Sequence, residues 1–127
     1  MKNMPTVTSK VFKEELDEIF KYASKLSKNY LMKCKKGISQ YIDTLKYFPY
    51  IGRYVYEISN KEYRERIYTN YRIVYQVFKQ LNFTYIHFIV HSKMNFLAHY
   101  KLYIKRRGKY EKERKSNKHV RKQNWSR

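Results

Sequence analysis

The chain has 127 residues, 43% of them hydrophobic and 18% aromatic, which is enough for one domain with a packed core. Its formal net charge of +19 predicts attraction to a polyanion such as nucleic acid or an acidic protein. We expect no membrane span and no secretory signal, because long uncharged apolar runs are absent. Together with the single cysteine, Cys34, which fits a reducing compartment as a buried thiol, this predicts a cytoplasmic protein.

Two amphipathic helices are predicted in the first part of the chain, after a short strand over residues 4–9. A serine or threonine caps the first helix from about Lys10. Its apolar residues recur with helical spacing: Phe12, Leu16, Ile19, Phe20, Ala23 and Leu26. A break at residues 27–29 precedes a second helix, which ends near Tyr47 because Pro49 follows. Together they predict an antiparallel helical hairpin.

Three strands in hairpin succession are predicted over residues 63–93, where Tyr, Ile, Val and Phe dominate. Polar turns at residues 69–70 and 80–82 separate them, and Val55 begins an edge strand before them. On the last strand, alternation sends one set of residues toward the helical hairpin: Ile86, Phe88 and Val90. The other set should face solvent or a ligand: Tyr85, His87, Ile89 and His91.

The pattern changes after Lys93. Residues 96–104 favour a short helix, and residues 101–127 hold 12 basic and 2 acidic residues, a net charge of +10. We therefore expect a domain over residues 1–100 and a basic extension over residues 101–127 that is partly helical or disordered. The expected fold class is α+β in the order β-α-α-β-β-β, with the helical hairpin packed on a small, mainly antiparallel sheet.

Several common kinds of site are missing from the sequence. The glycines are scattered and no Cys or His cluster has zinc-ligand spacing, so we expect no phosphate loop, metal or cofactor. The cations, histidines and tyrosines that remain suit cleavage of RNA by its own 2′-hydroxyl. That reaction needs a base, an acid, and cations for the charge that develops on the phosphate.

Five residues are candidates for this chemistry. Arg72 is the phosphate clamp, because a guanidinium binds phosphate oxygens bidentately. Arg64 and Arg66 on the neighbouring strand extend an electropositive groove that binds RNA. His91, at the end of the last strand, is the candidate acid or base, and Lys93 stabilises the developing charge.

Each candidate also has a structural interpretation that stays open. Arg72 can pair with Glu65 or Glu57 instead of a phosphate. His91 can simply close the sheet, and the two arginines of the preceding strand can form a solvated face.

The order of these elements and motifs resembles the RelE/ParE superfamily of bacterial toxins from type II toxin–antitoxin operons. The resemblance covers about residues 4–100 and rests on five segments that follow the helical hairpin: Phe48-Pro49, Gly52-Arg53-Tyr54-Val55-Tyr56-Glu57, Arg64-Glu65, Asn70-Tyr71-Arg72-Ile73-Val74-Tyr75-Gln76-Val77 and His91-Ser92-Lys93. The segments that begin at Gly52 and Arg64 are closest to the plasmid-stabilisation branch. The family's helical hairpin on an antiparallel sheet agrees with the fold expected above.

This resemblance implies a toxin with a cognate antitoxin and one of two targets. RelE-like members cleave mRNA on the ribosome and inhibit translation, and their basic positions correspond here to Arg64, Arg66, Arg72 and Lys93. His91 resembles a near-terminal histidine of the YoeB-like branch, while Glu57 and Tyr100 are the candidate bases. We therefore expect a ribosome-dependent mRNA endoribonuclease. The alternatives are a ParE-like inhibitor of DNA gyrase without a catalytic set, or a basic nucleic-acid-binding module.

Overall fold

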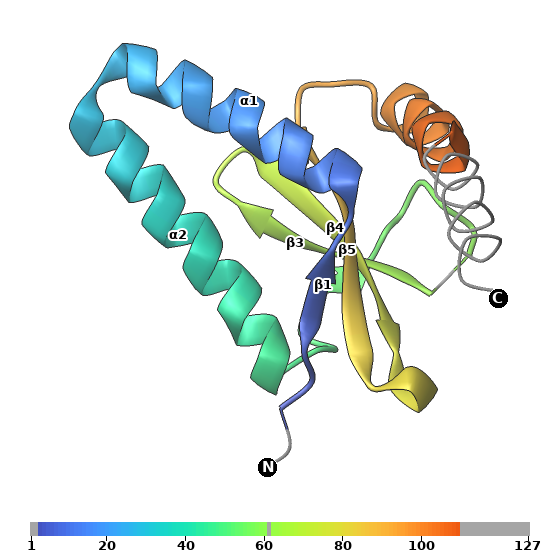
Figure 1. Ribbon diagram of the computed structural model, residues 1–127. Coiled ribbons are helices and arrows are strands. Elements are labelled where there is room, and N and C mark those ends of the chain that lie inside the picture. Colours follow the sequence, from blue (N-terminus) through green and yellow to red (C-terminus); the bar gives the residue numbers. More distant parts are fainter. Residues whose placement is uncertain (1–2, 61, 110–127) are drawn as a thin grey trace, which may run out of the picture.

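The computed structural model describes residues 3–60 and 62–109 (Figure 1). Its elements follow in the order β1 (Thr6–Thr8), α1 (Lys10–Leu26), α2 (Lys28–Tyr47), β2 (Arg53–Tyr54), β3 (Tyr63–Tyr68), β4 (Tyr71–Phe78), the 3-10 helix η1 (Lys79–Leu81) and β5 (Phe83–His91). A last helix runs over residues 96–109. The predicted α+β class and the predicted element order are confirmed. No helix in the described ranges is both long and apolar enough to cross a membrane.

Serine caps define both helices of the hairpin. Ser9 Oγ accepts a hydrogen bond from Phe12 N at 2.9 Å and begins α1. Ser27 ends α1 and begins α2, because its N–H donates to Ala23 O while its Oγ accepts from Tyr30 N at 2.9 Å. The predicted break between the helices is therefore confirmed and consists of a single residue.

The five strands form one mixed sheet in the order β1-β5-β4-β3-β2. The pairs from β2 to β5 are antiparallel, and β1 lies parallel to β5. The predicted turn at residues 69–70 is confirmed, with Thr69 at a φ of 49°. The predicted start of the edge strand at Val55 is wrong, because the strand is Arg53–Tyr54 and the chain turns at residues 56–57.

A β-bulge at His87 changes which side chains of β5 face the helical hairpin. Val74 pairs with Phe88 and Tyr75 with Ile86, so His87 is an extra residue on β5. Of the three residues expected to face the hairpin, only Ile86 does so. Phe88 and Val90 face the opposite side of the sheet, and Ile89 takes their place beneath the hairpin.

Both faces of the sheet are covered, which gives three layers (Figure 1). The hairpin packs on one face through a core of Phe12, Ile38, Leu45, Ile73, Tyr75, Ile86 and Ile89. Helix 96–109 packs on the other, in a core of Val11, Val55, Tyr63, Val74, Phe88, Val90, Phe96 and Tyr103. The expectation that this second face is open to solvent or ligand is therefore wrong.

The C-terminal helix is longer than the sequence predicted. It continues from residue 96 through residue 109, across the boundary expected at residue 100. Tyr103, beyond that boundary, is only 1% exposed and belongs to the core. The rest of the predicted basic extension, residues 110–127, lies outside the described residues.

Gly52 allows β2 to approach β3 closely, and we expect Gly52→Ala to lower the free energy of unfolding by about 1–3 kcal/mol. An added Cβ would lie 2.6 Å from the backbone oxygen of Glu65 and 2.5 Å from Tyr75 Oη. Gly108 is the matched control, because a Cβ there meets nothing within 4 Å and alanine favours the helix by up to about 1 kcal/mol. Urea unfolding of both variants measures the difference, and equal stabilities would contradict this close approach.

Candidate functional site

An open groove lies on the face of the sheet that carries helix 96–109, at the edge formed by β2 and β3. The residues that line it come from β2, the turn after it, β3, β4 and the turns that follow β3 and β5: Arg53, Tyr54, Tyr56, Glu57, Glu65, Ile67, Thr69, Arg72 and Ser92. Two of the predicted site residues, Arg72 and Glu57, meet in this groove.

Arg72 is held on three sides inside the groove. Its Nη1 and Nη2 donate to Glu57 at 2.9 and 2.6 Å in a bidentate pair, and its Nε donates to Glu65 at 2.6 Å. The guanidinium also lies over the ring of Phe96, 4.1 Å from its centroid. The second oxygen of Glu65 accepts from Arg53 Nε at 2.8 Å. Arg72 therefore binds both of the carboxylates that the sequence offers as its structural partners, Glu57 and Glu65.

This network makes the groove formally neutral. Two arginines and two glutamates line it, while the whole chain carries +19. Arg72 and Glu65 side chains are 12% and 1% exposed, so their attraction is weakly screened. The hydrogen bond from Arg72 holds the pKa of Glu57 below its usual range, and the same bond raises the pKa of Arg72. A phosphate that approached Arg72 would have to displace a carboxylate.

Arg64 and Arg66 lie on the opposite face of the sheet, because alternate residues of β3 face opposite sides. Arg64 donates to the backbone oxygen of Gly52 at 2.8 Å and stacks over the ring of Tyr54. Arg66 donates to the backbone oxygen of Tyr41 at 3.1 Å and stacks over the aromatic ring of the same residue. The structure therefore does not bring these two arginines to Arg72.

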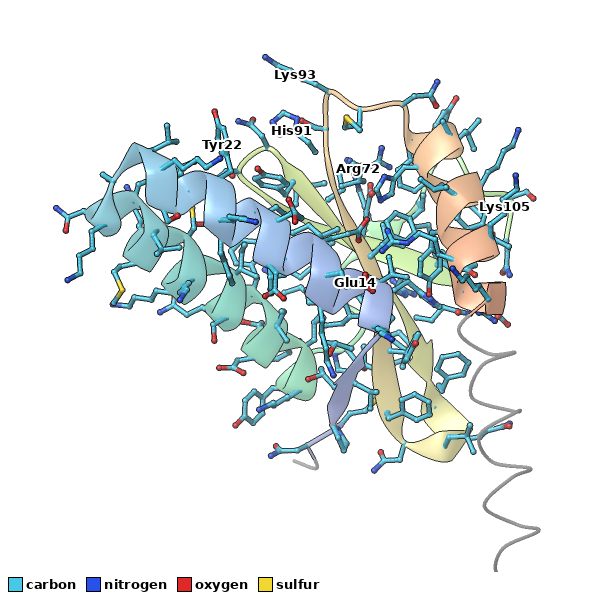
Figure 2. All side chains as sticks on the ribbon, turned by 45° about the horizontal axis from the view of Figure 1, so that its top comes forward. Glu14, Tyr22, Arg72, His91, Lys93 and Lys105 are labelled. Carbon is cyan, nitrogen blue, oxygen red and sulfur yellow. The ribbon has the colours of Figure 1, made fainter. Side chains whose placement is uncertain are left out.

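His91 is also separated from Arg72. Arg72 pairs with Val90, and His91 pairs with Tyr71, so the two side chains leave the sheet on opposite faces. The His91 ring packs edge-on against Tyr71, and its Nδ1 accepts from the N–H of Lys93 at 3.1 Å. Figure 2 shows the Lys93 side chain pointing away from the body of the protein, and it is exposed.

Tyr100 does not line the groove either. It lies on helix 96–109, partly buried against the core, with its ring edge-on to Tyr63. The structure thus brings together Arg72 and Glu57, and it distributes the other five sequence candidates elsewhere. No group of three or more His, Cys, Asp or Glu residues is placed to hold a metal ion within residues 3–60 and 62–109.

A buried polar network centred on His87 was missed in the sequence, which placed this histidine among the exposed residues. His87 Nε2 lies 2.7 Å from Gln76 Oε1 and its Nδ1 lies 2.5 Å from Tyr103 Oη. Gln76 in turn donates to Glu62 at 3.1 Å. Burial, with a smaller effect of Arg107, lowers the pKa of His87 to about 3, so the imidazole is neutral at physiological pH.

We expect acid to destabilise the fold through His87 at pH values where most carboxylates are still ionised. The unfolded histidine binds a proton below its reference pKa of about 6.5, whereas the folded one does so only near 3. Stability should therefore fall with decreasing pH below about 6.5, by at most about 1.4 kcal/mol per pH unit. Urea unfolding between roughly pH 5 and 7 measures this slope, because most carboxylates titrate below that range.

His87→Gln is the matched variant for this measurement, because it keeps polar atoms but cannot titrate. Its stability should change little over the same pH window. The same slope in both proteins would contradict the assignment of the pH dependence to His87.

The fold is that of a small α+β protein in which a helical hairpin packs on a mainly antiparallel sheet. A family model described as "ParE toxin of type II toxin-antitoxin system, parDE" matches residues 7–96. The chain therefore belongs to the ParE toxin family, and membership implies a cognate antitoxin. No curated protein matches the chain in a sequence search.

Proposed function

We propose that this toxin arrests growth by binding a protein target, DNA gyrase, without chemistry of its own. The observation that carries the proposal is the pairing of Arg72 with Glu57 and Glu65. In this proposal Arg72 fixes the shape of the groove and binds no phosphate.

The positions of the other candidates support binding over RNA cleavage. In-line cleavage needs a base, an acid and cations that converge on one phosphate. Here Arg72 is paired with carboxylates, while Arg66 and His91 leave the opposite face of the sheet. The ribosome-dependent mRNA endoribonuclease expected from the sequence is therefore less well supported than its ParE-like alternative.

The rim of the groove has the composition of a protein-binding surface. Tyr56 is 95% exposed in the turn after β2, and Ile67 is also exposed and lines the same groove. Aromatic residues of this kind dominate binding energy at protein interfaces, and the neutral groove imposes no charge requirement on its partner. We assign this rim, Tyr56 and Ile67, as the target-binding surface.

DNA gyrase is the target that ParE-like members of the superfamily inhibit, and the matching family model is that of ParE. The antitoxin in this proposal carries an acidic segment, since the chain it must cover is strongly basic. These two partners have different chemistry and are separable by mutation.

Purified toxin added to gyrase and relaxed plasmid DNA tests the proposal. We expect loss of supercoiling and accumulation of cleaved DNA held by gyrase, both prevented by the antitoxin. Unimpaired supercoiling, together with cutting of mRNA on ribosomes by the same preparation, would overturn it in favour of the endoribonuclease.

A further inference from the structure

We propose that the outer face of helix 96–109 binds the phosphate backbone of nucleic acid without regard to base sequence. The family match ends at residue 96, so nearly all of this helix lies beyond the part of the chain that defines the toxin family. The inference does not depend on the proposed target of the toxin.

The inner face of the helix is fixed to the rest of the protein. Phe96 and Tyr103 are 5% and 1% exposed in the core, and Tyr103 Oη contacts His87. Arg106 Nη2 donates to Glu14 on α1 at 3.2 Å. Because these contacts hold one side of the helix, the opposite side is presented to solvent in a defined orientation.

The outer face carries a row of lysines. Lys101, Lys105 and Lys109 are all exposed, and none of them forms an ion pair within the part of the chain that the structure describes. At 100° per residue they fall within a sector of about 80° opposite Phe96 and Tyr103, with a rise of about 6 Å between neighbours. Figure 2 shows Lys105 on the side of the helix that points away from the sheet.

The helix contains no acidic residue of its own, and the carboxylates that reach it from α1 contact Arg106 and His99, not the three lysines. Residues 96–109 include five Lys and Arg and no Asp or Glu, and one of the five, Arg106, forms an ion pair with Glu14. In sequence, residues 110–127 add seven Lys and Arg against two Glu. The basic character that begins on the helix therefore continues along the chain.

The chemistry of the row favours nucleic acid over an acidic protein or a membrane. Lysine is a compact point charge that suits phosphate, and it is depleted at protein interfaces. Leu97, Leu102 and Ile104 flank the row but are only about half exposed. The main apolar face of the helix already packs on the sheet, so it is not available for insertion into a bilayer.

Salt-dependent binding of a short mixed-sequence DNA duplex to the full chain tests this inference. Replacement of Lys101, Lys105 and Lys109 by glutamine should flatten the plot of log affinity against log salt by about 1 per lysine. The matched control replaces Lys21, Lys25 and Lys28, which are exposed around the turn between α1 and α2. It removes the same charge and should leave the slope nearly unchanged.

Thermal unfolding checks that both triple variants fold. The single change Lys105→Glu, at an exposed position, should also weaken DNA binding. Absence of DNA binding by the unmodified protein would overturn the inference. So would equal loss in the two triple variants, or competition by polyglutamate as effective as that by DNA. None of these readouts involves gyrase, so failure here is distinguishable from failure of the proposed target.

Discussion

Arg72→Ala is expected to lower the free energy of unfolding by about 3–5 kcal/mol, because it leaves a buried carboxylate without its partner. Glu65 is 1% exposed and would keep only its bond to Arg53, while Glu57 would lose its bidentate partner. The stacking of Arg72 over Phe96 would be lost as well. Urea unfolding at neutral pH measures the change.

Arg53→Ala is the matched control, because Arg53 binds the other oxygen of the same Glu65 carboxylate. Its side chain is 69% exposed, so we expect a loss of at most about 1 kcal/mol. Equal small losses in the two variants, with toxicity abolished only by Arg72→Ala, would indicate that Arg72 acts on a ligand and has no structural role.

Tyr56→Ala is expected to raise the toxin concentration needed for half-inhibition of gyrase supercoiling by about 30-fold or more. An exposed aromatic residue at the centre of an interface contributes roughly 2 kcal/mol or more to binding. Tyr56 makes few contacts within the chain, since it is 95% exposed, so the free energy of unfolding should not change.

Tyr22→Ala controls for loss of an exposed tyrosine elsewhere. Tyr22 is 62% exposed on α1, away from the groove, and its removal should leave gyrase inhibition unchanged. Full potency of Tyr56→Ala, or an equal loss in both variants, would contradict the assignment of the groove rim as the target-binding surface.

Local signals in the sequence predict the helical hairpin and the order of the strands along the chain. Ser9 and Ser27 cap the helices through their own side chains, and the turn at residues 69–70 follows from two short polar residues. These features depend on neighbours in sequence, so no knowledge of tertiary contacts was needed. The type of fold could be derived for the same reason.

The site is less predictable from the sequence than the fold is, because it depends on contacts between residues that are distant in the chain. One extra residue at His87 inverts the alternation of β5, and no local pattern marks it. The sequence predicts a short helix over residues 96–104 but neither its extension to residue 109 nor its packing on the sheet, although Phe96 and Tyr103 have the spacing of one helix face. The sequence indicates Glu57, Glu65 and a phosphate as partners for Arg72, and only contacts between distant residues distinguish among them.

Mapping of RNA 5′ ends in cells that produce the toxin tests most directly whether it acts by binding alone. We expect growth arrest with the signature of gyrase damage and no new 5′ ends at fixed codon positions. New codon-positioned ends that disappear in His91→Ala would contradict a binding-only toxin and would place catalysis at the end of β5.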